Sequence, residues 1–270
     1  MKDKSKITTA VTIAVFVLLT IVLILLVPVE NRRLEIEKYG QLAIDAETNE
    51  KAKYIYENIE IYDESLWRMY NDYYGDEGKV DFVYNYPQYK DAYLTMTFTQ
   101  EELNSEKPVK LYMSDTRWAY EKMAGNYIYE VGCAPVSITM AYLHIKKDGN
   151  LDPVKAARLI EENDAIGFWG GLDVTKAAGI FESIGLNVVE YRYDIEGSEP
   201  DEQTIKDILD RGNVVFLGAH GAVFGDHALL IVDYSDEGFE INDPASEEKS
   251  HKIWSFEEIK DDIYYIWELN

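Results

Sequence analysis

Residues 130–137 read EVGCAPVS and place Cys133, the single cysteine in the sequence, directly before an apolar helical stretch. The N-terminus of a helix carries partial positive charge, which favours the thiolate form of a cysteine over the thiol. Cys133 is therefore a candidate nucleophile. The alternative is that Cys133 is a small core residue, which is the commoner role of a free cysteine.

Two residues downstream complete a candidate triad. His227 lies in residues 225–232, GDHALLIV, before an apolar strand, and Asp243 lies in residues 241–244, INDP, after another strand. In neighbouring antiparallel strands such positions come within hydrogen-bond reach, so that His227 would take the thiol proton and Asp243 would orient the imidazole. Each residue alone is a weak signal, because a histidine before a strand is usually structural and Asn-Asp-Pro is an ordinary turn.

The N-terminal part of the sequence contains a candidate membrane span. Residues 7–29 are 23 consecutive residues without a charge, and a helix of about 20 apolar residues crosses a hydrocarbon core of about 30 Å. A signal-peptide core is usually only about 7–15 residues long and ends at small residues. Bulky residues here continue to Pro28, and no Ala-x-Ala site follows them. The pattern therefore favours an uncleaved membrane anchor over a signal peptide.

Basic residues flank this span on both sides. Three lysines precede it, at positions 2, 4 and 6, and by the positive-inside rule they favour a cytoplasmic N-terminus. Arg32 and Arg33 on the far side favour the opposite orientation. We expect a single-pass protein of the cell membrane, held through residues 7–29, with its C-terminal domain extracytoplasmic.

Acidic residues dominate after the span. Residues 30–270 contain 23 Lys and Arg against 49 Asp and Glu, a formal charge of −26. Such a surface repels nucleic acid and anionic lipid, so we expect no nucleic-acid partner. The acidic surface also favours basic substrates, although the simpler explanation of the negative charge is an acidic exterior exposed to solvent. A single cysteine also allows no disulfide within the chain and leaves the thiol free.

Helical patterns come first along the chain and strand patterns mostly later, which predicts an α+β fold with a largely antiparallel sheet. We expect helices over residues 30–63, 133–145, 174–184 and 202–210, with further helix starts at Asp152 and Ser255. We expect strands over residues 187–191, 214–217, 228–234, 239–242 and 263–267. The expected organisation is a cytoplasmic tip and anchor over 1–29, a helical, tyrosine-rich lead-in over 30–105, and a domain with the triad residues over 106–270.

Together, four motifs resemble the papain-like cysteine peptidases of the bacteriocin-processing (double-glycine leader) peptidase-like family, in its stand-alone exported branch. Residues 115–118, DTRW, are similar to the family's Asp-x-Arg-Trp motif, and residues 132–135, GCAP, are similar to its Gly-Cys-Gly-Pro. Residues 226–227, DH, before an apolar strand are similar to its Gly-His strand, and residues 242–244, NDP, match its Asn-Asp-Pro. The resemblance is clearest from residue 109 onward.

The resemblance implies a papain-like fold for residues 106–270, in which a helix packs on a mainly antiparallel sheet. It also implies roles for the three triad residues. Cys133 would be the nucleophile, His227 the base and Asp243 the residue that orients the base.

Three positions depart from the family pattern. The family has Gln two residues before the Asp of Asp-x-Arg-Trp, where the amide helps to bind the oxyanion, whereas this chain has Met113. A thioether has no proton to donate, and loss of one oxyanion donor costs about 10²–10³ in rate in the best-studied serine case. Ala134 replaces the Gly after the nucleophile, and Asp226 replaces the Gly before His227.

Two functions remain open from the sequence. The first is a membrane-anchored cysteine peptidase that acts on peptide or protein substrates outside the cell, and the second is a binding or scaffolding ectodomain that keeps the fold without efficient catalysis. The Cys/His/Asp set favours the first, and Met113 favours the second. Processing of double-glycine leaders is disfavoured, because that chemistry belongs on the cytoplasmic side beside a transporter.

We expect neither a cofactor nor a metal site. One cysteine cannot build a thiolate cluster. No metal-ligand spacing connects the four histidines, which are His144, His220, His227 and His251.

The uncharged span behind three lysines predicts the topology of the protein in cells. External protease should remove the C-terminal domain from intact cells and leave an N-terminal stub in the membrane, as read by immunoblotting of a tag at each end. Protection of the whole chain would contradict the extracytoplasmic placement. Release of a soluble form that begins near residue 30, without added protease, would contradict the uncleaved anchor.

Overall fold

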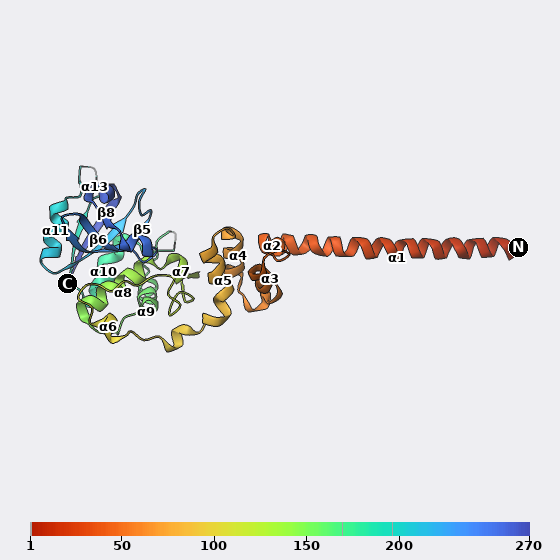
Figure 1. The fold of residues 1–270 in the computed structure, drawn as a ribbon, viewed down its shortest axis with the longest axis horizontal. Coiled ribbons are helices and arrows are strands. Elements are labelled where there is room, and N and C mark those ends of the chain that lie inside the picture. Colours follow the sequence, from red (N-terminus) through yellow and green to blue (C-terminus); the bar gives the residue numbers. More distant parts are fainter. Residues whose placement is uncertain (1, 169, 196) are drawn as a thin grey trace. The chain divides into compact units, whose positions relative to one another are not determined.

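The computed structural model describes residues 2–168, 170–195 and 197–270. Contacts within the chain divide it into two compact units, one ending at Gln88 and the other running from Tyr89 to Asn270 (Figure 1). Each unit buries apolar side chains of its own.

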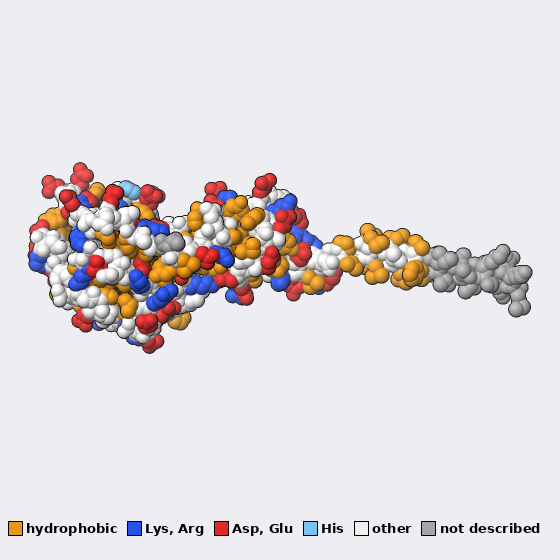
Figure 2. All heavy atoms as spheres, turned by 90° about the horizontal axis from the view of Figure 1, so that it is seen from below, with side chains coloured by type: hydrophobic (Ala, Val, Ile, Leu, Met, Phe, Trp, Pro, Cys, Tyr) orange, Lys and Arg blue, Asp and Glu red, His pale blue; other side chains and the backbone are white. Residues whose placement is uncertain are grey.

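The first unit begins with α1 (Lys2–Tyr39), whose side chains are described from Val15 onward. Val15–Tyr39 is long and apolar enough to cross a membrane, with a mean hydropathy of 2.1 and no burial inside the protein. Figure 2 shows apolar side chains along its described N-terminal part, in contrast to the mixed charges elsewhere on that face. The expected span at residues 7–29 lies in α1, although the side chains of residues 7–14 fall outside the described ones. Length and composition make α1 a candidate membrane helix and say nothing of its orientation.

Four shorter helices follow α1: α2 (Gln41–Asp45), α3 (Glu50–Glu57), α4 (Glu64–Tyr73) and α5 (Glu77–Tyr89). The helical pattern expected over residues 30–63 is therefore broken, first at Gly40, whose φ of 59° suits a residue without a side chain. Asn49 and Asp63 begin α3 and α4 by accepting hydrogen bonds from N–H groups in the first turn.

Tyrosines contribute to the packing of the first unit. The rings of Tyr54 and Tyr84 meet edge to face at 5.2 Å, and those of Tyr39 and Trp67 at 5.8 Å. Such pairs stabilise a fold beyond the area that they bury. The tyrosine-rich segment therefore forms part of a packed unit.

The second unit begins with a short segment that holds η2 (Ala92–Thr95) and α6 (Gln100–Leu103). The start of α6 is a capping box, in which Thr99 and Glu102 exchange side-chain and backbone hydrogen bonds. Glu102 also forms an ion pair with Arg117 at 2.8 Å. Residues 89–105, expected as part of the lead-in, thus make contacts within the second unit.

A six-stranded sheet forms the centre of the second unit, with the order β3-β8-β4-β5-β6-β7 and every neighbouring pair antiparallel. Its strands are β3 (Val188–Arg192), β4 (Val214–Ala219), β5 (His227–Ser235), β6 (Gly238–Asn242), β7 (Ile253–Trp254) and β8 (Ile263–Leu269). A separate hairpin joins β1 (Lys122–Met123) to β2 (Asn126–Tyr127). The expected α+β class with an antiparallel sheet is confirmed.

Helices cover both faces of this sheet (Figure 1). The α-helices that follow α6 are α7 (Ile128–Val131), α8 (Cys133–Lys146), α9 (Pro153–Glu162), α10 (Ala177–Ser183), α11 (Glu202–Asp210), α12 (Glu247–His251) and α13 (Phe256–Ile259). Strand β4 shows the division most clearly, because Phe216 packs in one core with α8 and α10, whereas Val215 and Leu217 pack in another with α11. Burial on both faces explains why β4 reads as an unbroken apolar run.

Most expected elements are confirmed within a few residues. Asp152 accepts hydrogen bonds from Val154 and Lys155 N–H groups at the start of α9, and α11 spans residues 202–210 as expected. The helix expected over 174–184 begins instead as a 3-10 turn (Val174–Lys176) before α10. The short elements α12 and β7 have no counterpart among the expectations, since a few mixed polar residues carry little periodicity.

Phe181 provides a test of this core. It is fully buried on α10 and meets Phe216 at 5.0 Å and Trp267 at 6.0 Å between ring centroids. Phe181→Ala should lower the free energy of unfolding by about 3–5 kcal/mol, because it removes buried area and leaves a cavity. The measurement is chemical denaturation of the full chain in detergent.

Val189→Ala is the matched control, because Val189 lies on β3 and is 50% exposed. It should change the free energy of unfolding by less than about 0.5 kcal/mol. Equal effects of the two substitutions would contradict the packing of α10 on the sheet.

Candidate active site

A cavity of about 450 Å³ opens beside the start of α8. Val131 of α7 and Cys133 of α8 contribute to its lining, together with the ends of three strands and with Gly167, Phe168, Gly171, Leu172 and Val174. From the strands come Gly218 near the end of β4, His227 at the start of β5, and Tyr264 and Tyr265 near the start of β8. The cavity therefore brings a helix N-terminus against one end of the sheet.

Cys133 is the first residue of α8 and its side chain is partly exposed. Gly132 joins α7 to α8, and its N–H donates to the Ile128 carbonyl at 2.8 Å. A Cβ at residue 132 would lie 2.4 Å from that carbonyl oxygen, which no side chain tolerates. The close approach of the two helices thus explains the glycine directly before the cysteine.

His227 lies between the other two predicted triad residues. Its Nε2 and Asp243 Oδ1 are 2.7 Å apart, and its side chain is only 10% exposed. Cys133 lines the same cavity as His227, and the two groups shift each other's pKa; Nδ1 is the ring nitrogen that Asp243 leaves for the sulfur. The structure therefore brings together all three residues that the sequence singles out.

Asp243 is held from several sides in the turn after β6. It is 1% exposed, and its N–H donates to Ser250 Oγ on α12 at 2.8 Å. Its Oδ1 accepts from the Ala245 N–H at 2.8 Å as well as bonding His227. Its Oδ2 is buried with no hydrogen-bond partner among the described residues. The carboxylate is thus fixed toward the imidazole.

The neighbours of Asp243 tie this turn to the start of the second unit. The Asn242 side-chain amide donates to the Pro108 carbonyl at 2.8 Å. The Pro244 carbonyl accepts from the Met113 N–H at 2.8 Å. Asn242, Asp243 and Pro244 therefore each make a separate contact, and Asp243 faces His227.

The charges of Cys133 and His227 are coupled. Burial by itself lowers the pKa of His227, but its interactions with Asp243 and Cys133, which accept from the protonated ring, outweigh burial and raise that pKa overall. Burial by itself raises the pKa of the Cys133 thiol, but the hydrogen bond to His227 and its positive charge outweigh it and lower that pKa. Backbone hydrogen bonds from Ala134 and Ala228 lower it further. Both shifts favour the charged forms, so the environment favours a thiolate–imidazolium pair over a neutral thiol and imidazole.

The same interaction acts on the carboxylate. Burial raises the pKa of Asp243, but the hydrogen bond from His227 and the charge of that ring outweigh it, so the pKa of Asp243 is lowered overall. Asp243 therefore stays ionised and supplies the negative charge that keeps the imidazole protonated.

Asp262 is a residue of this region that the sequence did not single out. It is 2% exposed, and its Oδ2 accepts from the N–H groups of Val223 and Phe224 in the loop before His227. A Cβ at Gly221 would lie 2.2 Å from Asp262 Oδ1, so the loop passes very close to this carboxylate. The sequence feature that indicated a loop here was its two glycines, at positions 221 and 225.

A second histidine–aspartate pair lines the same cavity. His220 Nδ1 hydrogen-bonds to Asp226 Oδ1, and the His220 ring packs on Tyr264 at 5.2 Å. Both members of the pair are mostly exposed, in contrast to His227 and Asp243. Sequence spacing gave no indication of this pair, because it depends on the pairing of β4 with β5.

Met113 does not occur among the described residues that line the cavity. Its side chain is 7% exposed and belongs to the apolar core that also holds Ala134 and Ala228. The oxyanion role of this position stays a prediction.

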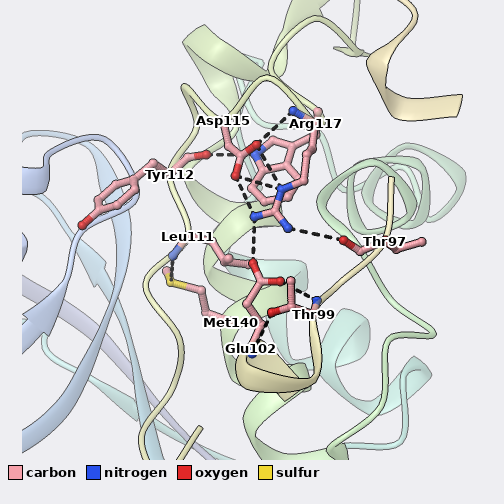
Figure 3. A network of polar contacts seen from close by, with 9 residues as sticks. Thr97, Thr99, Glu102, Leu111, Tyr112, Asp115, Arg117 and Met140 are labelled. Atoms are coloured by element: carbon pink, nitrogen blue, oxygen red, sulfur yellow. Dashed lines mark hydrogen bonds and ion pairs between the residues drawn. The ribbon is translucent and has the colours of Figure 1, made fainter. Parts of the chain in front are cut away.

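The Asp-x-Arg-Trp motif forms a polar network with Glu102 (Figure 3). Arg117 bonds to Asp115 at 2.7 Å and to Glu102 at 2.8 Å, and the buried Trp118 donates to the Tyr112 carbonyl at 2.9 Å. These contacts stabilise the turn that leads into Trp118. The motif thus has a structural role outside the cavity lining.

Within the described ranges, no group of three or more His, Cys, Asp or Glu side chains is arranged to hold a metal ion. The chemistry that the arrangement supports is nucleophilic. A thiolate lies beside an imidazolium that can donate a proton, and a buried carboxylate orients the ring.

A family model described as Peptidase_C39 like family matches residues 114–269. This range covers more than half of the chain and includes Cys133, His227 and Asp243. No curated protein and no solved structure gives a significant match to the chain.

The coupled charges predict fast alkylation of Cys133 in mildly acidic solution. Roughly 0.3% of a thiol with a pKa of about 8.5 is ionised at pH 6, so iodoacetamide should label Cys133 at least about tenfold faster than free cysteine at that pH. The rate should fall only as the pH drops through the lowered pKa of Cys133. The measurement is the labelling rate by mass spectrometry.

Two variants separate the effects of His227 and Asp243 on the labelling rate of Cys133. His227→Ala should return the rate to that of an ordinary thiol, and Asp243→Asn, which removes the charge but keeps an amide oxygen for the ring, should lower it partly. Equal rates in wild type and His227→Ala, or no labelling of the folded protein, would support a buried core cysteine instead.

Proposed function

Because the chain belongs to the Peptidase_C39 like family, we propose that it is a cysteine peptidase that hydrolyses peptide bonds with Cys133 as nucleophile. His227 is the general base and acid, and Asp243 orients the imidazole. The observation that carries this proposal is the hydrogen bond between His227 and Asp243 beside a cavity that Cys133 and His227 both line, together with the effect of His227 on the pKa of the thiol. A papain-like fold over residues 106–270 is part of the same proposal.

The first half-reaction acylates Cys133. The thiolate attacks the carbonyl carbon of the scissile bond, and the negative charge moves to the carbonyl oxygen. When this intermediate collapses, the C–N bond breaks and His227 gives its proton to the departing amine. The products are a free amine, a thioester on Cys133 and a neutral imidazole.

The second half-reaction restores the enzyme. Water attacks the thioester carbon while His227 takes one of its protons, and the C–S bond breaks to release the carboxylic acid. Cys133 is again a thiolate and His227 again an imidazolium. Asp243 keeps the ring oriented throughout, because its Oδ1 holds Nε2 and leaves Nδ1 toward the sulfur.

Oxyanion stabilisation sets the rate of this proposed enzyme. The backbone N–H of Cys133, at the start of α8, is one donor to the developing charge. Met113 stands where the family has a glutamine amide, and its thioether donates no proton. A hole that lacks one donor under-stabilises the tetrahedral intermediate by about 2.7–4 kcal/mol.

The second candidate function is a binding or scaffolding ectodomain on the same fold, and Met113 is the observation that favours it. The thiol chemistry favours the enzyme, because a site retained only for binding has no use for a thiolate–imidazolium pair. Processing of double-glycine leaders is the weakest of the three functions, since it requires a cytoplasmic placement.

The proposed location follows from α1. Its apolar length supports an anchor in the cell membrane, and the three lysines before residue 7 support an extracytoplasmic catalytic domain. The substrates are then peptides or proteins outside the cell, and no nucleic acid takes part.

Turnover of a mixed peptide library tests the proposal. Cys133→Ala should abolish hydrolysis in every background, and Met113→Gln should raise it by about 10²–10³, because the amide restores a donor to the oxyanion. The measurement is product formation by wild type, Met113→Gln and Met113→Gln/Cys133→Ala.

Two outcomes would change the account. Strong Cys133-dependent turnover by wild type, unchanged by Met113→Gln, would show that another donor such as Ser114 completes the site. No turnover by any variant would favour the binding ectodomain.

A further inference from the structure

Two carboxylates line the same cavity as Cys133. Glu130 lies in α7, three residues before Cys133, and Asp226 directly precedes His227. No Lys or Arg occurs among the described residues that line the cavity. Glu130 and Asp226 are therefore the acidic side chains of the lining, and His220 is the partner of Asp226.

The backbone fixes both carboxylates relative to the reacting groups. Glu130 is connected to Cys133 through the tight junction at Gly132, which has no space for a Cβ. Asp226 follows the loop whose N–H groups bond to Asp262, and its carboxylate is oriented by His220. Both residues therefore belong to the cavity that also holds Cys133 and His227.

The rest of the lining suits the stem of a long cationic side chain. Leu172 and Val174 are aliphatic, and Tyr264 and Phe168 are aromatic, with Phe168 92% exposed. The faces of aromatic rings attract cations, and Lys and Arg lay their methylene groups along apolar surface while the charged end reaches a polar partner.

We propose that the substrate carries a Lys or Arg side chain within about two residues of the scissile bond, and that Glu130 and Asp226 bind its charge. This specificity rests on the proposed peptidase function. Opposite charges in a partly enclosed cavity attract far more strongly than in open water. Asp226, which stands where the family has glycine, is then a specificity-determining residue.

The alternative is that the overall acidity of the protein attracts cations without any local site. Asp236 and Glu237 allow this alternative to be separated, because they lie exposed in the turn between β5 and β6. Asp236→Asn/Glu237→Gln removes the same charge as Glu130→Gln/Asp226→Asn, but away from the cavity lining.

The reaction rates of charged thiol reagents report the electrostatic potential at Cys133, and their measurement does not require catalysis. Aminoethyl and sulfonatoethyl methanethiosulfonate carry one positive and one negative charge. Each transfers its alkylthio group to the thiolate, so that a disulfide forms and methanesulfinate leaves. Rates are measured on the full chain in detergent and divided by the rates for free cysteine.

The positive reagent should react at least about tenfold faster than the negative one after this correction. Glu130→Gln/Asp226→Asn should bring the two rates within about twofold, and Asp236→Asn/Glu237→Gln should leave most of the difference. For each variant, the rates of both charged reagents are divided by the rate of the uncharged methyl reagent, which removes any change in the reactivity of Cys133 itself. Equal rates in wild type, or equal effects of the two double variants, would overturn the inference.

Peptides complete the test. Products from a mixed library locate the scissile bond, and a series that differs only by Lys, Gln or Glu beside it gives kcat/KM for each. The Lys peptide should exceed the Gln peptide at least about tenfold. Cys133-dependent hydrolysis that ignores this charge would overturn the inference and leave the peptidase function standing. Reagent selectivity without hydrolysis of any peptide would overturn the peptidase function and leave the cation preference of the cavity standing.

Discussion

The hydrogen bond between His227 and Asp243 is the interaction on which the candidate site depends. Asp243 is almost fully buried and one of its oxygens has no described partner, so its charge is compensated chiefly by the imidazole. A buried charge without a partner is costly, which means that the pair favours a protonated His227. A protonated His227 in turn lowers the pKa of Cys133. The thiolate is thus a consequence of where the carboxylate is buried.

Hydrogen bonds to the backbone of the turn at Asp243 keep this pair in place. Ser250 Oγ accepts a hydrogen bond from the Asp243 N–H, and the Pro244 carbonyl accepts one from the Met113 N–H. The bond from Met113 does not depend on which side chain residue 113 carries. This explains how methionine can occupy the position of the family's glutamine without disturbing the turn at Asp243.

Local sequence patterns predicted the elements that carry the site. The apolar run after Cys133 and the strands around His227 and Asp243 have clear periodicity, and the order of the motifs brought these residues together in one hypothesis. Such patterns could not predict the contacts that depend on the pairing of strands. The His220–Asp226 pair needs the register of β4 with β5, and the role of Asp262 needs a loop from a distant part of the chain. Local patterns also could not predict the bond between Glu102 and Arg117, which lies 15 residues further on.

The ionisation of Cys133 tests the central claim most directly. Since the chain has one cysteine, labelling of cysteine Cβ with carbon-13 gives a single resonance whose shift reports thiol or thiolate as the pH changes. The account predicts a midpoint well below the ordinary pKa of about 8.5, and a return toward that value in His227→Ala. A midpoint at or above the ordinary value in the folded wild-type protein would contradict the thiolate–imidazolium pair and the function built on it.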